Sequence, residues 1–81
     1  MQILCEGSMN FEFEKAVGQR IRRWREKRGL TQEQLSAKLQ VEGCDITRSA
    51  LAKMEVGQRH IYVDELKLIA ELLDVEYSDL L

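Results

Sequence analysis

Four side chains near the middle of the chain combine hydrogen-bonding or methyl groups with helical spacing: Arg48, Ser49, Ala52 and Lys53. On an α-helix these positions share one face, while Leu51 and Met54 fall on the opposite face. Arginine can donate two bonds to a planar pair of acceptors, serine can donate or accept, and alanine offers a methyl contact. Such a set suits recognition of base edges in duplex DNA, because a helix fits the major groove and residues near its N-terminus reach those edges.

These residues need a helix to hold them, and the surrounding segment ITRSALAKMEVGQR (46–59) predicts one. Thr47 is a preferred N-cap residue, and Gly57 supplies a favourable stop. Ile46 and Leu51 flank the cap as a hydrophobic staple. We therefore expect a helix over about 47–56.

Charge is unevenly distributed along the 81 residues, although the formal net charge is only -2. Residues 1–14 contain three acids and no base, residues 15–59 contain eleven bases and five acids, and residues 60–81 contain six acids and one base. Exposed charges act over about 10 Å in ordinary salt, so a local surplus decides what docks at a local face. An overall pI near 5.4 would argue against a nucleic-acid partner. The local surplus of basic residues in the central part argues for one.

Apolar periodicity and capping residues predict the remaining helices. The first spans about 12–28, with Phe13, Val17, Ile21 and Trp24 on one face, and ends at Gly29. The second begins after Thr31, which forms a capping box with Gln34. Leu35 and Leu39 form the inner face of this second helix. The fourth spans about 63–73, a turn follows at Asp74, and a last short helix begins near Ser78.

The chain therefore predicts an all-α fold, a compact bundle of four to five short helices that contains a helix-turn-helix. The length suits one domain, 11–81, preceded by a disordered or loosely ordered tail at 1–10. No apolar run approaches the roughly 20 residues that span a bilayer, and the start lacks the basic flank of a signal peptide. We expect a cytoplasmic protein, bacterial or phage-encoded, associated with the nucleoid when bound to DNA.

Enzymatic chemistry finds no support in the sequence. The one histidine, His60, has no serine or cysteine at catalytic spacing, and no glycine-rich phosphate loop is present. Cys5 and Cys44 are far apart and are interpreted as two reduced thiols rather than a disulfide or metal site. We expect no enzyme activity, no cofactor, no metal and no small-molecule substrate.

The segments GQRIRRWREKRGLTQEQLSAKL, ITRSALAKMEVGQR and VDELKLIAELLDV occur in this order over residues 14–81. In this combination the chain resembles the lambda-repressor-like (Cro/XRE-type) helix-turn-helix family of DNA-binding proteins. The resemblance implies base contacts by Arg48, Ser49, Ala52 and Lys53, and phosphate contacts by Gln32, Thr47 and Arg59. It also implies a structural ion pair between Arg25 and Glu55.

Two departures from the family stand out. Val56 occupies a position where members often have asparagine, which removes one polar contact to the DNA backbone. The connection QVEGCDI (40–46) is roughly five residues longer than the usual turn, a length that loops tolerate at small thermodynamic cost. Its acids, Glu42 and Asp45, would be repelled by phosphate.

Two functional hypotheses follow. The first is a sequence-specific transcriptional regulator, a repressor, that contacts the major groove of double-stranded DNA with the third helix. One such helix covers few base pairs, so we expect a homodimer, with the acidic and apolar part around 62–81 as the place for self-association. The alternative is a protein-interaction module, such as the antitoxin of a toxin–antitoxin pair, whose acidic segments suit a basic protein partner.

Overall fold

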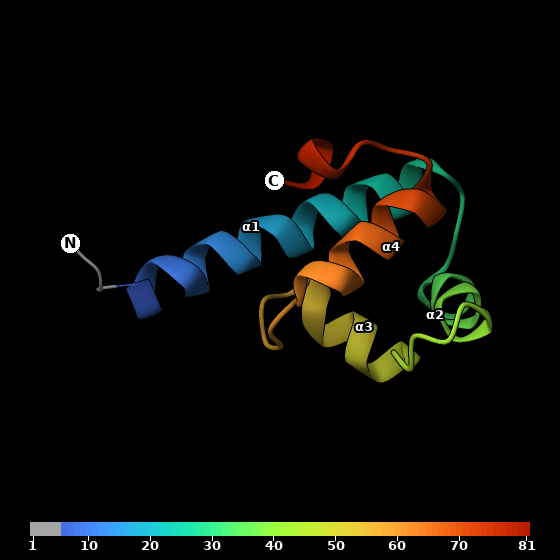
Figure 1. The fold of residues 1–81 in the computed structure, drawn as a ribbon, viewed down its shortest axis with the longest axis horizontal. Helices are drawn as coiled ribbons and strands as arrows, with labels where there is room; N and C mark the ends of the chain where they lie inside the picture. The colour runs from blue at the N-terminus through green and yellow to red at the C-terminus, as the bar shows by residue number, and fades with distance from the viewer. Residues whose placement is uncertain (1–5) are drawn as a thin grey trace.

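The computed structural model describes residues 6–81, which form helices joined by short connections and contain no strand. In chain order these are α1 (Glu6–Lys27), α2 (Gln32–Val41), α3 (Arg48–Glu55), α4 (Val63–Leu73) and the 3₁₀ helix η1 (Tyr77–Leu80). Helix α1 is the longest and runs along the body, with α3 and α4 packed against it and α2 at its far end (Figure 1). The predicted all-α fold is confirmed. No described helix is long and apolar enough to cross a membrane.

Helix α1 begins earlier than the expected residue 12. It starts at Glu6, so part of the segment predicted as a loose tail is helical, and the rest of that prediction lies outside the described residues. The first turns of α1 extend beyond the other helices (Figure 1). Phe13 was placed on the buried face with Val17 and Ile21, but its exposed fraction is 50%.

The starts of α2 and α3 are set by local side-chain chemistry. Thr31 Oγ1 accepts the Gln34 N–H at 3.0 Å, and Gln34 Oε1 accepts the Thr31 N–H at 2.9 Å, which completes a capping box. Thr47 Oγ1 accepts the Ala50 N–H at 3.1 Å. Each threonine satisfies a backbone donor that the helix itself leaves without a partner. The cap therefore fixes the residue at which each helix begins.

All four α-helices end in one motif, in which two N–H groups beyond the helix bond back to its last turn. The second of these bonds joins Leu30 N–H to Arg25 O, Cys44 N–H to Leu39 O, Gln58 N–H to Lys53 O and Val75 N–H to Ala70 O. The motif needs a left-handed residue, which Gly57 supplies at φ 81 and Asp74 at φ 58. At α2 it includes Gly43, so Gln40 and Val41 are helical and the connection to α3 is shorter than expected.

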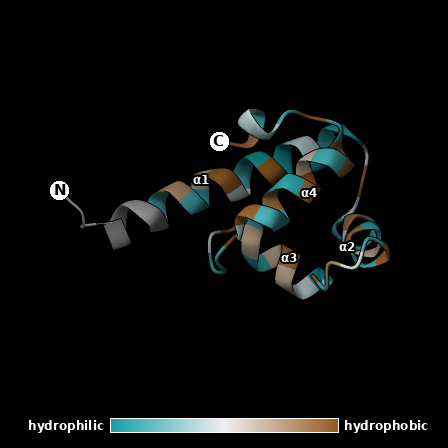
Figure 2. Ribbon diagram, viewed as in Figure 1, coloured by the Kyte–Doolittle hydropathy of each residue, from teal (hydrophilic) through white to brown (hydrophobic). Residues whose placement is uncertain are grey.

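One contiguous apolar core joins all five helices. Figure 2 shows hydrophobic and hydrophilic residues alternating along the helices, as expected of elements with one buried face. Its fully buried side chains come from every element: Ile21, Leu35, Leu39, Ile46, Leu51, Met54, Ile69, Leu73 and Leu80. Ile46 and Leu51, on either side of the α3 cap, are both within this core, so burial as well as capping fixes the start of α3.

Helices α1 and α3 cross at Gly18. A Cβ atom at this position would overlap the Met54 carbonyl oxygen and press on the backbone of Glu55. The missing side chain therefore allows the two backbones to touch, and the C-terminal end of α3 is held on α1.

Candidate nucleic-acid interface

Helix α3 presents one buried and one exposed face. Leu51 and Met54 are completely buried, whereas Arg48, Ser49 and Lys53 are exposed and Ala52 is half-buried. The four positions predicted to contact bases therefore lie together on the outer side of one short helix. None of the three polar side chains has a hydrogen bond or ion pair with any described residue, so their donors are free for an external partner.

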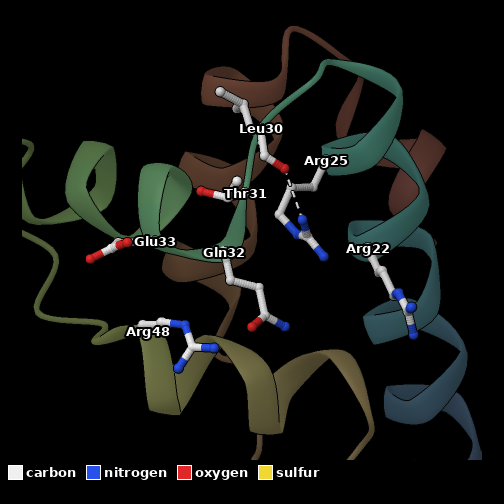
Figure 3. A pocket seen from close by; sticks show the side chains of 7 residues that line it. All are labelled: Arg22, Arg25, Leu30, Thr31, Gln32, Glu33 and Arg48. Carbon is white, nitrogen blue, oxygen red and sulfur yellow. Dashed lines mark hydrogen bonds between the residues drawn. The ribbon is translucent and has the colours of Figure 1, made fainter.

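The N-terminal end of α3 faces the N-terminal end of α2 across a hollow (Figure 3). Arg48 from α3 and Thr31, Gln32 and Glu33 from the start of α2 line this space. The N-termini of both helices carry partial positive charge and unpaired N–H groups. The arrangement therefore combines exposed polar side chains with two helix ends that favour an anion.

Arg25 and Glu55 meet in the interior beneath this hollow. Arg25 Nε and Nη2 donate to the two oxygens of Glu55 at 2.7 and 3.0 Å, and Arg25 Nη1 donates to the Leu30 carbonyl at 2.8 Å. Both residues are buried, with side-chain exposures of 8% and 1%. The bidentate pair fastens the end of α3 to the end of α1 and to the connection before α2.

Gln32 is attached to the same carboxylate. Its Nε2 donates to Glu55 Oε1 at 3.0 Å, a contact that the sequence pattern did not indicate. An amide nitrogen has two N–H groups, so one is committed to Glu55 and the other remains available. Glu55 thereby holds the Gln32 amide, which the resemblance assigned to a phosphate, in a fixed orientation.

Arg59 is engaged within the chain. It donates to both oxygens of Glu65 at 3.0 Å and to the His60 carbonyl at 2.9 Å. Three of its five N–H groups are thus used, and two remain for a phosphate. Its hydrogen bond to Glu65 raises the pKa of Arg59 further. The sequence assigned Arg59 only to DNA, whereas the structure gives it a role in holding the start of α4.

The pKa of Glu65 reflects opposing effects. Partial burial acts to raise it, but the hydrogen bonds from Arg59 and from the Tyr62 N–H outweigh burial, and the pKa lies below its ordinary value of 4.5. The Tyr62 N–H bond, at 3.1 Å, caps the first turn of α4. Glu65 therefore joins the α3–α4 connection to α4 as long as it is ionised.

The same connection is tied to α1 by Glu14. Its Oε1 lies 2.9 Å from His60 Nδ1, and its Oε2 accepts the Ile61 N–H at 3.3 Å. His60 is thus part of a surface contact between elements. Among residues 6–81, no group of three or more His, Cys, Asp or Glu side chains is arranged to hold a metal ion.

Cys44 is a free thiol in the α2–α3 connection. Partial burial, followed by the carboxylates of Glu65 and Asp64, raises its pKa. A thiol that stays protonated is a poor nucleophile. Cys5, the other cysteine of the sequence, lies outside the described residues.

The sequence interpretation gave Arg22 no individual role, because it treated the basic residues of the first helix together, as a solvated stripe that could add attraction for phosphates. This residue lines the hollow together with Arg25, three positions later on α1. Helical spacing alone places positions 22 and 25 on neighbouring rows, which is the signal that would have identified it. Six further basic side chains on or beside α1 made the individual role of each one indistinct.

The sequence pattern of the helix-turn-helix family matches residues 21–80, which include the hollow, α3 and its supporting ion pair. The chain belongs to this family and to its Cro/C1 (XRE) type, whose members are DNA-binding transcription regulators. No curated protein and no solved structure matches the chain.

Proposed function

We propose that this protein is a sequence-specific DNA-binding transcriptional regulator, a repressor, that inserts α3 into the major groove. The observation that carries the proposal is the exposed, unpartnered set of Arg48, Ser49 and Lys53 on a helix whose opposite face is fully buried. A rigid helix with free donors near its N-terminus suits base-edge contacts. Ala52 adds a methyl-sized surface for thymine.

Phosphate contacts come from the residues around this helix. Gln32 has one amide N–H to donate, and Thr47 retains its hydroxyl proton while its oxygen caps α3. Arg59 contributes the N–H groups that Glu65 leaves free. Together they position the protein on the backbone, and the α3 side chains provide sequence discrimination.

A homodimer completes the proposed regulator. An eight-residue helix covers few base pairs, so two half-sites roughly 34–36 Å apart are needed for useful affinity. Tyr62, Val63, Tyr77 and Leu81 are exposed apolar side chains in the C-terminal part of the chain and suit self-association. Sedimentation velocity with and without DNA measures the stoichiometry, and two chains per duplex are expected.

Selection of bound duplexes from a random library tests binding, sequence preference and half-site spacing together. Fluorescence anisotropy on the selected duplex then compares Arg48→Ala with Lys67→Ala, an exposed cation on α4. Loss of a bidentate base contact costs about 1–3 kcal/mol, so Arg48→Ala is expected to weaken binding about 5-fold to 150-fold and to relax one base-pair preference. Equal effects of the two variants would contradict a base contact by Arg48.

The alternative function is a protein-interaction module, such as an antitoxin. It is favoured by the acidic C-terminal part, where Asp64, Glu71, Glu76 and Asp79 are all exposed. This hypothesis predicts no enrichment of any duplex and no salt-dependent binding. Complex formation with a basic protein partner would then replace DNA binding as the activity to measure.

A further inference from the structure

The hollow between α1, α2 and α3 is an open space of about 550 Å³. Arginines from two helices line it: Arg22 and Arg25 from α1 and Arg48 from α3. Figure 3 shows Arg22 and Arg48 on either side of Gln32, which projects between them. Three helices thus contribute donors to one surface.

The donors of these side chains are not equally free. Arg25 is buried and uses three of its five N–H groups on Glu55 and the Leu30 carbonyl, so its charge is already paired inside the protein. Arg48 has no partner among the described residues. Among the described residues, Arg22 has one hydrogen-bond partner, Glu26, which it contacts through Nε at 3.2 Å, so both of its terminal nitrogens remain available. Arg22 and Arg48 are therefore the two unsatisfied cations of the hollow.

Two acids near the hollow limit what it can bind. Glu33 lines it, but its side chain extends away from Arg22, beyond Thr31 (Figure 3). Glu26 pairs with Arg22 outside the hollow, and both side chains are more than half exposed, at 56% and 59%. An exposed pair of this kind is weak, so an anion with higher charge density can replace Glu26 as the partner of Arg22.

We propose that Arg22 is a further DNA-contacting residue, through which α1 binds one backbone phosphate in this hollow. Guanidinium groups match the oxygens of phosphate in bidentate geometry and remain charged at every physiological pH. Gln32, which keeps one spare amide N–H, and its neighbours at the start of α2 line the same space, and a helix N-terminus favours an anion. The proposal rests on the DNA-binding function above. It gives α1 a direct contact with DNA in addition to its support of α3.

The test compares Arg22→Ala with Arg23→Ala by anisotropy on the selected duplex and on a scrambled duplex of equal length. Arg23 is the matched control because it is the adjacent exposed arginine and does not line the hollow. Each phosphate contact contributes about 0.9 to the slope of log affinity against log salt. Arg22→Ala is expected to lower that slope by this amount on both duplexes, whereas Arg23→Ala leaves it unchanged. Arg22→Lys retains the charge and is expected to restore the slope.

Neutral methylphosphonate substitutions, placed one at a time along the selected duplex, locate the contact. One substitution is expected to weaken binding of the wild type and of Arg23→Ala but not of Arg22→Ala. Equal slopes for the two alanine variants, or no phosphate whose effect depends on Arg22, would overturn the proposal. In that case the wild type still binds DNA, whereas failure of the proposed function appears as no wild-type binding to any duplex.

Discussion

The carboxylate of Glu55 connects three parts of the protein at the scale of single residues. It accepts two hydrogen bonds from Arg25 on α1 and one from Gln32 on α2, while Glu55 itself belongs to α3. The group is buried, with a side-chain exposure of 1%, so these donors take the place of water in stabilising its negative charge. The position of the Gln32 amide, the proposed phosphate donor, therefore depends on the buried carboxylate of Glu55.

Removing one member of this pair is predicted to destabilise the fold more than replacing both. Glu55→Ala leaves the Arg25 charge buried and uncompensated, which costs on the order of 3–5 kcal/mol. The double variant Arg25→Met, Glu55→Leu leaves no buried charge and is expected to be more stable than Glu55→Ala. Urea unfolding measures the free energies, and a double variant whose cost equals the sum of the two single losses would contradict this account.

Glu65 predicts a pH-dependent contribution to stability. Its pKa is lowered in the folded state, so its stabilisation is fully present above the ordinary value of 4.5 and is lost as pH falls through the lower folded value. Glu65→Gln is expected to be less stable than wild type at pH 7, with the difference shrinking below about pH 4.5. Thermal unfolding between pH 7 and pH 3 measures this, with the exposed Glu71→Gln as control. A difference that stays constant with pH would show that the Glu65 charge is not responsible.

At the scale of elements, the parts of the fold that local sequence determines were predictable. The caps at Thr31 and Thr47 involve residues three positions apart, and the bounds of α4 follow from its apolar stripe. The early start of α1 has no cap or periodicity to indicate it. The α2 end was missed because the segment 40–46 was interpreted as loop, although Gly43 there is a helix-ending residue.

The candidate site was predictable to the extent that it follows from one helix face. The exposure of Arg48, Ser49 and Lys53 follows from the burial of the opposite side of α3. The contacts of Gln32 with Glu55 and the lining of the hollow by Arg22 depend on how three helices pack. Such relations between elements are not expressed in the spacing of any single segment.

The crossing of α1 and α3 predicts an unusual response to a helix-favouring substitution. In an open helix, Gly→Ala stabilises by about 1 kcal/mol. Gly18→Ala is expected to destabilise instead, by about 1–3 kcal/mol, because the new methyl group overlaps the Met54 carbonyl and forces α3 outward. Gln19→Ala, exposed on the same helix, is the control and should change stability by less than about 0.5 kcal/mol. Chemical denaturation distinguishes these outcomes, and a stabilised Gly18→Ala would contradict the close crossing.

At the scale of the whole molecule, the last helix and the first helix contribute side chains to the same core. η1 packs on α1 and α4, and Leu80 is completely buried in the same cluster as Ile21 and Leu51. A core that contains side chains from every element has no part that can unfold without exposing the rest. The domain should therefore unfold in one cooperative step, with the DNA-contacting face as stable as its support.

Leu80 and Leu81 offer a matched test of this cooperativity, because adjacent leucines are 0% and 42% exposed. Leu80→Ala removes a buried side chain and is expected to cost about 2–5 kcal/mol. In a domain of this size each kcal/mol lowers Tm by about 4–8 °C, so the decrease should be evident, whereas Leu81→Ala should change Tm little. Hydrogen exchange of α3 amides provides the decisive measurement. If Leu80→Ala accelerates exchange in η1 while leaving α3 protection unchanged, the two ends of the chain do not share one cooperative core.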